Sequence, residues 1–447
     1  MFPRYEEYRR HVLALFQAAL TAVDPAAAVH AHLHLTSQAL ISGPHQYDLA
    51  QGRIFLVSVG KAAVPMAQAA SQALGAALHA GIVVAKTLPA ELTLSPDKIA
   101  VYTGSHPVPG PDSLRAAAAV HTLLQTTAAN DLVLCLISGG TSALLSQPLV
   151  SLADWQALNR ALLASGCAIE EFNTVRRQMD AVKGGGLRRW AAPARCISLI
   201  LSDVVGNPLP VIGSGPTVVS DDTPADALAV LARYGVAERL DTAVYQRIHA
   251  ALSQQPPPPA ALPPAAHVIV GDARQAALAA QNRAAELGFT AQILTAQLAG
   301  EAREVGRVAA AIAKDTPPNH CFILAGETTV TLSGAGLGGR NLETALAAAV
   351  ALGGQPQVVL SSLATDGEDG PTAAAGAVVT GETAVYAHRC HLDPVAHLHR
   401  HDSYPFFQQL DQHTAHRTPA CLVQTGPTGT NVNDLIFILR YQPYLTK

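Results

Sequence analysis

The segment from Gly326 to Glu343 carries the side chains best suited to chemistry on an anionic substrate. It reads GETTVTLSGAGLGGRNLE and joins an apolar strand pattern to an alanine- and leucine-rich helical pattern. Its glycines let backbone N–H groups turn toward an anion, and the start of a helix adds partial positive charge. Arg340 adds a fork of donors that matches phosphate or carboxylate oxygens, while Glu327 and Glu343 could hold a metal ion or a hydroxyl group. Further candidate binding residues are Thr328, Gly338, Gly339 and Asn341.

This pattern makes phosphoryl chemistry the first hypothesis, and a second loop supports it. Gly60 and Lys61 lie where an apolar strand pattern passes into an alanine-rich helical pattern. A lysine in the first turn of a helix is electrostatically disfavoured unless an anion compensates it, so Lys61 is suited to phosphate oxygens. The alternative is a solvated lysine at a helix start. The G-x-x-x-x-G-K-[ST] spacing of a Walker loop is absent, which argues against that type of nucleotide site.

A third loop, SGGTS, follows another buried strand pattern. Its backbone N–H and hydroxyl groups could bind phosphate or carboxylate, and the alternative is a helix cap with glycines for close packing. A nucleophilic serine is not favoured, because the G-x-S-x-G spacing is missing. The candidate binding residues here are Ser138, Gly139, Gly140, Thr141 and Ser142.

Two acidic residues also follow apolar strand patterns. Asp203 ends one such pattern, and Asp366 belongs to the sequence TDGEDG. A carboxylate at the end of a buried strand can hold Mg²⁺ or accept a proton, and the alternative for each is a turn-forming acid.

Other polar residues are open to both functional and structural interpretations. Asn173, Arg176 and Lys183 lie on a helical pattern and could border a substrate carboxylate. His106, in the sequence HPVP, is expected to be structural. The histidines at 397, 399 and 401 are expected to be exposed rather than to bind a metal.

These loops need a framework that brings strand ends together. The expected strands of the first half span 54–59, 81–85, 99–102, 132–137 and 196–201. Continuous apolar strands that alternate with helices are typical of an α/β fold, in which a parallel sheet is covered on both faces. Ligands of such sheets bind at the carboxyl ends of the strands, where the loops described above are expected.

The proline-rich stretch 256–264 is the clearest domain boundary, because proline favours a stiff, extended connector. The sequence therefore predicts an N-terminal Rossmann-like domain at 1–255 and a smaller α/β domain at 265–447. The second domain is expected to begin with a strand at 267–270. The active site is expected in the cleft between the two domains.

Composition narrows the class of protein. The net charge of −4 gives no footprint for nucleic acid or an anionic membrane. The six cysteines are scattered without a C-x-x-C pair, and the N-terminus lacks an apolar signal segment. These features predict a cytoplasmic enzyme that binds small molecules, with a homodimeric state left open.

Taken together, the motifs resemble those of the class II glycerate 2-kinases, whose C-terminal half carries the domain called MOFRL. The resemblance runs from end to end. Thr141, Val205, Asn207 and Leu342 depart from the usual residues of the family. The motifs that carry it are GKA at 60, HPVP at 106, ISGGTSAL at 137, NTVR at 173, KGG at 183, SD at 202, SGPT at 214, GETTV at 326, GGRN at 338, TDGEDGPT at 365, DSY at 402 and TGPTGTN at 425.

This resemblance implies that ATP phosphorylates D-glycerate at its 2-hydroxyl group, with Mg²⁺, to give 2-phosphoglycerate. It implies that Lys61 and Arg340 stabilise the transferring phosphoryl group, and that Thr430 and Asn431 belong to the binding site. It further implies that Asp203, Glu327 and Asp366 supply the metal ligands, and that Asp203 or Asp366 accepts the hydroxyl proton.

Two other classes of function compete with this interpretation. An NAD(P)H-dependent hydroxypyruvate reductase is disfavoured, because no G-x-G-x-x-G follows an early strand with an acid about 20 residues later. A non-catalytic sugar-acid-binding protein is disfavoured by the lysine, the arginine and the several acids at strand ends.

Overall fold

The computed structural model describes residues 5–48, 52–89, 91–255, 261–414 and 420–443, which form two compact units. The parallel-sheet unit comprises Pro25–Ser202 and Asn207–Val270. The mixed-sheet unit comprises Met1–Asp24, Asp203–Gly206 and Gly271–Lys447. The α/β class expected from the sequence is confirmed, with one six-stranded sheet in each unit.

The sheet of the parallel-sheet unit has the strand order of a doubly wound fold. Numbered within the sheet, this order is 3-2-1-4-5-6, and the first five strands are parallel to their neighbours. After β6 the chain returns to the middle of the sheet and adds β7 on the other side of β4. The loops after β4 and β7 therefore flank the switch point where such folds bind ligands. In spatial order the strands are β6 (Ile99–Thr103), β5 (Leu78–Ala85), β4 (Ile54–Val59), β7 (Leu132–Ile137), β8 (Arg195–Leu201) and β9 (Ala265–Gly271).

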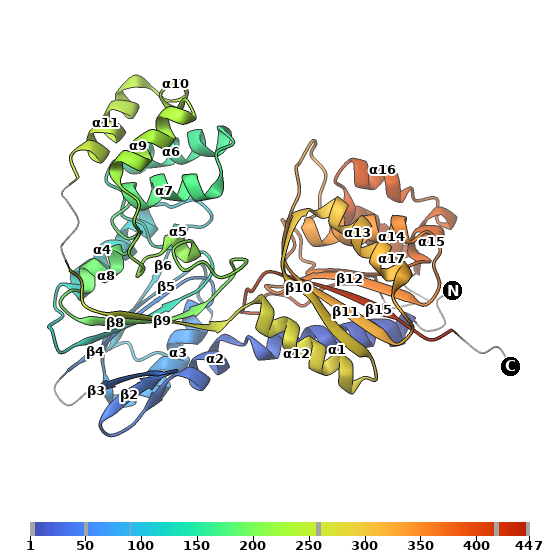
Figure 1. Cartoon of the computed structure of the whole chain (residues 1–447), viewed down its shortest axis with the longest axis horizontal. Helices are drawn as coiled ribbons and strands as arrows, with labels where there is room; N and C mark the ends of the chain where they lie inside the picture. Colours follow the sequence, from blue (N-terminus) through green and yellow to red (C-terminus); the bar gives the residue numbers. More distant parts are fainter. Residues whose placement is uncertain (1–4, 49–51, 90, 256–260, 415–419, 444–447) are drawn as a thin grey trace. The chain divides into compact units, whose positions relative to one another are not determined.

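Burial explains why the central strands form where the sequence predicts them. Every residue of β4 and β7 is buried, because helices cover both faces of the sheet. Helix α3 packs on β4 and β5, while α4 packs on β5 and β6 from the opposite face (Figure 1). The helices and short 3₁₀ turns of this unit are α2 (Pro25–His32), α3 (Ala63–Leu74), η1 (Gly75–Ala77), α4 (Pro111–Leu124), α5 (Thr141–Leu144), α6 (Leu152–Ala164), α7 (Ile169–Met179), α8 (Gly186–Ala191), η2 (Ile212–Ser214), α9 (Pro224–Arg233), α10 (Val236–Arg239) and α11 (Thr242–Ser253).

A second hydrophobic core holds helix α7 in place. Trp155 of α6 is fully buried in this core, together with Val175 of α7 and Ile248 of α11. The amphipathic pattern of α7 therefore buries its apolar side against α6, α9 and α11, while its polar residues include Arg176.

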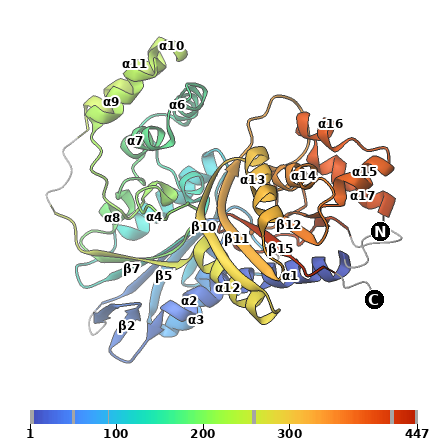
Figure 2. The same cartoon turned by 45° about the vertical axis from the view of Figure 1, so that its right-hand side comes forward.

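The mixed-sheet unit is built on parallel and antiparallel pairs. Strands β10 and β11 are parallel, whereas β15 is antiparallel to both β11 and β12. Helices α1 and α12 lie on one face of the sheet, and α13 and α14 lie on the other (Figures 1 and 2). In spatial order the strands are β10 (Thr290–Glu301), β11 (His320–Thr329), β15 (Asp434–Arg440), β12 (Val358–Ala364), β13 (Gly376–Thr380) and β14 (Leu422–Val423). The helices are α1 (Tyr5–Ala22), α12 (Ala273–Glu286), α13 (Ala302–Asp315), α14 (Arg340–Leu352), α15 (Thr383–Arg389), α16 (Pro394–His399) and α17 (Ser403–Thr414).

The units of the structure differ from the predicted boundaries 1–255 and 265–447 at three places. The strand expected to open the second domain is β9, which completes the sheet of the first unit beside β8. Helix α1 packs on α12 and so belongs to the mixed-sheet unit. The short segment after β8, Asp203–Gly206, belongs there as well. Residues 256–260 of the predicted linker lie outside the described residues.

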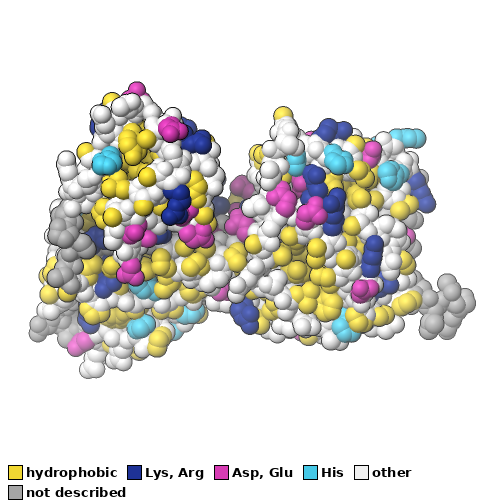
Figure 3. Space-filling model, turned by 45° about the horizontal axis from the view of Figure 1, so that its top comes forward, with side chains coloured by type: hydrophobic (Ala, Val, Ile, Leu, Met, Phe, Trp, Pro, Cys, Tyr) yellow, Lys and Arg dark blue, Asp and Glu magenta, His cyan; other side chains and the backbone are white. Residues whose placement is uncertain are grey.

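Some elements are absent from the sequence prediction. These are helices α9, α10, α11, α15, α16 and α17, strands β13 and β14, and a small antiparallel sheet of β1 (His34–Leu35), β2 (Ala39–Ser42) and β3 (His45–Asp48). On the face drawn in Figure 3, basic and acidic side chains are interspersed on each unit.

Within the described residues no single helix has the length and apolar content needed to cross a membrane; α1 and α2 meet these criteria only when taken together.

A buried ion pair after α7 gives a first testable prediction. Lys183 and Asp180 are both fully buried, and Lys183 Nζ lies 2.7 Å from Asp180 Oδ2. Burial lowers the pKa of Lys183 to about 8, against the opposing effect of Asp180. Replacing Asp180 with asparagine is expected to reduce the free energy of unfolding by about 3–5 kcal/mol at neutral pH, because it leaves an unpaired buried ammonium.

The loss should shrink as the pH rises toward about 8, because the unpaired lysine of the folded variant then releases its proton while the paired lysine of the folded wild type keeps it. Urea denaturation of the variant and the wild type across this range measures the effect. The double variant Asp180→Asn/Lys183→Met should recover part of the loss. A pH-independent difference between the Asp180→Asn variant and the wild type would contradict the assignment.

Candidate active site

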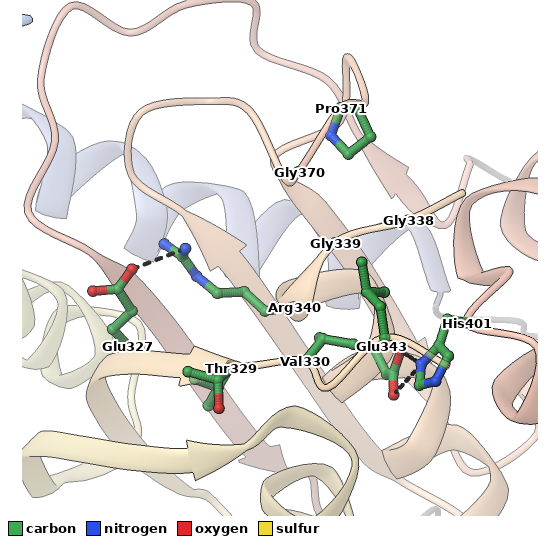
Figure 4. Close-up of a pocket in the computed structure, with 12 residues that line it drawn as sticks. Glu327, Thr329, Val330, Gly338, Gly339, Arg340, Glu343, Gly370, Pro371 and His401 are labelled. Atoms are coloured by element: carbon green, nitrogen blue, oxygen red, sulfur yellow. Dashed lines mark hydrogen bonds and ion pairs between the residues drawn. The ribbon is translucent and has the colours of Figure 1, made fainter. Parts of the chain in front are cut away.

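The mixed-sheet unit contains a pocket of about 400 Å³ beside the glycine-rich loop. The pocket confirms that the loop, the end of β11 and the start of α14 lie together. Figure 4 shows Arg340 directed toward Glu327, and Glu343 directed toward His401. The lining residues are Glu327, Thr328, Thr329, Val330, Leu332, Gly338, Gly339, Arg340, Glu343, Gly370, Pro371 and His401.

Two carboxylates hold the guanidinium of Arg340. Its Nε and Nη2 donate to Asp434 at 2.6 and 3.1 Å, and its Nη1 lies 2.9 Å from Glu327 Oε1. Burial alone would lower the pKa of Arg340, but the charges of Asp434 and Glu327 raise it, so the group stays cationic. About a third of the side chain is exposed, which leaves the cation accessible from the pocket.

The start of α14 is fixed by Asp369, an acid of the TDGEDG segment with no predicted role of its own. Its carboxylate accepts the backbone N–H groups of Asn341 at 3.0 Å and Leu342 at 2.8 Å. Burial raises the pKa of Asp369 to about 7, while these hydrogen bonds oppose the rise. Gly339 is required here, since a Cβ atom would lie 2.3 Å from Asp369 Cγ. Asp369 thus occupies the helix N-terminus that was predicted to bind the anion directly.

The predicted acids Asp203 and Asp366 lie in the mixed-sheet unit, together with the TGPTGTN segment at 425–431. Asn431 Nδ2 donates to Asp203 Oδ2 at 3.3 Å, and the Glu368 N–H donates to Asp366 Oδ1 at 3.2 Å. The hydroxyl of Thr430 is buried and donates to Val23 O at 2.8 Å, a contact that fixes α1 to this loop.

The predicted metal ligands, Asp203, Glu327 and Asp366, do not form a ready-made cage. In the chain as described, no group of three or more His, Cys, Asp or Glu side chains is arranged to hold a metal ion. Mg²⁺ commonly binds one or two carboxylates together with substrate phosphates, and Glu327 in the pocket wall is a ligand of that type. The residues present therefore fit a magnesium ion that arrives with a phosphorylated substrate.

In the parallel-sheet unit the Gly60–Lys61 loop and the SGGTS loop are joined at the switch point. The Lys61 N–H donates to Gly139 O at 2.8 Å, and the Ala62 N–H donates to Ser138 Oγ at 3.0 Å. The hydroxyl of Thr141 donates to Val59 O at 2.9 Å. Ser138 and Thr141, predicted to bind an anion, thus use their hydroxyl groups to hold the two strand ends together.

This junction requires a glycine at position 60. Its φ is +132°, and a Cβ atom would lie 2.1 Å from Ser138 Oγ. The Gly60→Ala variant is expected to lose about 2–4 kcal/mol of stability, from backbone strain and steric overlap. Gly166→Ala is the matched control, because its φ is also positive but no atom lies within 4 Å. Chemical denaturation should show a much smaller loss for this control, and equal losses would refute the close approach.

Of the helical residues, Arg176 reaches the SGGTS loop. Its Nη2 donates to Ser142 Oγ at 2.6 Å, a contact that the sequence did not predict. Lys183, by contrast, is fully buried against Asp180.

The contacts of three acids and the burial of two histidines were not predicted from the sequence. His401 and His397 are buried, with exposed fractions of 7% and 9%, although both were expected to be exposed. His401 Nδ1 lies 2.9 Å from Glu343 Oε2, and its Nε2 lies 3.1 Å from Ser333 Oγ, so it ties the glycine-rich loop to α14. A spacing of two residues between histidines matches no face of a helix, so it gives no signal for such a contact. The missed acids are Glu343 as the partner of His401, Asp369 as a cap and Asp434 as the partner of Arg340.

Comparison with known proteins places this arrangement in a family. Residues 11–249 match the family model described as Domain of unknown function (DUF4147), and residues 320–434 match the MOFRL family. D-glycerate 2-kinase of Thermotoga maritima is 42% identical over 86% of this chain and 90% of its own length. A protein of Agrobacterium vitis with the provisional name hydroxypyruvate reductase is 38% identical over 96% of this chain and 94% of its own length.

A comparison with a solved structure agrees with these sequence matches. The crystal structure of glycerate kinase from Thermotoga maritima is 38% identical and has a TM-score of 0.83, covering 97% of this chain and 100% of that chain. The match of both family models and of the whole fold identifies the chain as a member of the class II glycerate kinase family.

Proposed function

We propose that the protein is a kinase that transfers the γ-phosphoryl group of ATP to the 2-hydroxyl group of D-glycerate, giving 2-phosphoglycerate and ADP. The observation that carries this proposal is the pocket around Arg340, in which a fixed cation lies at the start of a helix beside a glycine-rich loop. Membership of the glycerate kinase family supports the identity of the substrate.

In this mechanism the protein positions the reactants and neutralises charge. Phosphoryl transfer passes through a loose transition state with negative charge on three oxygens, so cations supply most of the catalysis. Arg340 in the mixed-sheet unit and Lys61 in the parallel-sheet unit are the proposed cations. Gly338 and Gly339 let Ser403 and Asp369 approach the loop closely, which fixes the backbone beside Arg340.

An aspartate that acts as a base accepts the proton of the substrate hydroxyl group. The 2-hydroxyl oxygen forms a bond to the γ-phosphorus, the bond to the β-phosphate oxygen of ADP breaks, and the hydroxyl proton passes to Asp203 or Asp366. Asn431 orients the carboxylate of Asp203. Glu327, with Asp203 and Asp366, is proposed to hold Mg²⁺, which would neutralise phosphate charge when bound.

The test is to incubate the purified protein with D-glycerate, ATP and Mg²⁺ and to identify the product by phosphorus NMR. The signal of 2-phosphoglycerate is expected. Formation of 3-phosphoglycerate would overturn the assignment of the 2-hydroxyl group, and ATP consumption without a phosphorylated acid would overturn the kinase assignment.

The same preparation tests the alternatives. Oxidation of NADH or NADPH by hydroxypyruvate would support the reductase that the provisional name of one relative describes, and tight glycerate binding without turnover would support a binding protein. A cytoplasmic location and a homodimeric state stay predictions from the sequence, to be tested by fractionation and by sedimentation.

A further inference from the structure

Three segments of the parallel-sheet unit meet around the guanidinium of Arg176. Arg176 Nη2 donates to Ser142 Oγ at 2.6 Å, and Ser142 Oγ lies 2.9 Å from Ser214 Oγ. Ser214 in turn donates to Asn173 Oδ1 at 3.5 Å. These four residues, named the Arg176 cluster, come from α5, α7 and η2. The cluster therefore joins one cation to several polar groups next to the end of β7.

The region around this cluster has more positive than negative charge. Arg176 and Lys183 both interact with one carboxylate, Asp180, and Lys183 forms the direct ion pair with it. Burial lowers the pKa of Arg176 to about 10, and Asp180 only partly opposes this effect. Since a largely desolvated cation is costly without a matching anion, Arg176 favours an anionic ligand.

Arg176 also has an unused hydrogen-bond donor. Its Nε atom is buried, and it has no hydrogen-bond partner among the described residues. Buried donors are nearly always satisfied, so an orphan donor in a native structure needs an explanation, such as a ligand. The guanidinium carbon lies 5.1 Å from the centre of the Phe172 ring, which restrains the fork by a cation–π contact.

A ligand can reach the Arg176 cluster from solvent. The side chains of Arg176 and Ser142 are partly exposed, unlike the Asp180–Lys183 pair behind them. The SGGTS loop that carries Ser142 also binds the backbone of Lys61, so the cluster borders the switch point of the sheet. His106 packs near Gly140 there, and burial together with Lys61 and Lys86 lowers its pKa. Cations thus predominate on this edge of the unit.

We propose that the Arg176 cluster is the site that binds the carboxylate of the hydroxy-acid substrate. The Nε and Nη donors of Arg176 take the two carboxylate oxygens, the hydroxyl group of Ser142 adds a donor, and Ser214 positions Ser142. The cluster then selects a hydroxy acid over a neutral polyol such as glycerol, which leaves the guanidinium uncompensated. Only the identity of the acid as glycerate rests on the proposed function.

The test is to compare the Arg176→Met variant with the wild type. KM for D-glycerate is expected to rise about 10- to 100-fold, the usual effect of losing charge-assisted hydrogen bonds, while KM for ATP changes less than about threefold. Arg176→Lys should be intermediate, because it keeps the charge but loses the fork. Arg160→Met, an exposed arginine of α6, is the matched control and should leave both constants unchanged.

Calorimetric titration of the wild type and of Arg176→Met with D-glycerate, glycerol and inorganic phosphate separates carboxylate from phosphate binding. Loss of D-glycerate binding alone supports the proposal. If Arg176→Met weakens phosphate or ATP but not D-glycerate, the cluster is a phosphate site and the proposal is overturned.

Two further outcomes are distinguished: a variant that does not fold, and a protein that binds D-glycerate without phosphorylating it. If Arg176→Met does not fold, as judged by circular dichroism, Ser214→Ala should still raise KM for D-glycerate severalfold, and an unchanged KM would refute the cluster. If the wild type binds D-glycerate through Arg176 but does not phosphorylate it, the kinase proposal fails while the carboxylate site stands.

Discussion

Replacing Arg340 with methionine is expected to lower kcat for glycerate phosphorylation by about three orders of magnitude. A cation that meets charge as it develops in the transition state typically contributes factors of this size in phosphoryl transfer. Arg340→Lys should retain part of the activity, because an ammonium group keeps the charge but not the paired donors that contact Asp434. A coupled assay of ADP release at saturating substrates measures the effect.

The control must separate catalysis from stability, because Asp434 is buried and Arg340→Met leaves it without its partner. The double variant Arg340→Met/Asp434→Asn removes the unpaired carboxylate. It is expected to unfold at a higher denaturant concentration than Arg340→Met, yet to remain as inactive. Recovery of turnover in the double variant would show that Arg340 supports the fold rather than the reaction.

The second large effect is expected for Lys61→Met, with a loss of about two to three orders of magnitude in kcat. The backbone N–H of Lys61 keeps its bond to Gly139 O in this variant, so the loop should stay in place while the ammonium group is lost. Lys314→Met, on the exposed side of α13, controls for a general change of charge. Turnover within a few-fold of the wild type would remove Lys61 from the mechanism.

Burial decides which elements could be predicted from the sequence. Strands β4 and β7 lie at their predicted residues, because a strand covered on both faces must be apolar throughout. The loops that follow them were predicted for the same reason. In contrast, β10 alternates between exposed and half-buried residues, and the sequence predicts a strand only over its residues 292–294.

Long-range partners were the part that could not be predicted. Arg340 was identified from its loop, but Asp434 starts the last strand and has no local pattern that points to Arg340. An amphipathic helix such as α1 shows that one side is buried, but not which sheet buries it. The strand β9 was assigned to the wrong unit because the proline-rich stretch before it indicated a boundary, and its register with β8 is a tertiary property.

The placement of α1 has a consequence for biosynthesis. The Tyr5 hydroxyl donates to Val378 O and Arg9 donates to Leu422 O, so this helix docks on strands made more than 350 residues later. During translation these contacts cannot form until β13 and β14 have left the ribosome, although α12, on which α1 also packs, is made earlier. Such late closure makes the nascent chain a natural client for chaperones that shield apolar helices, and it ties completion of the mixed-sheet unit to a helix made before the parallel-sheet unit.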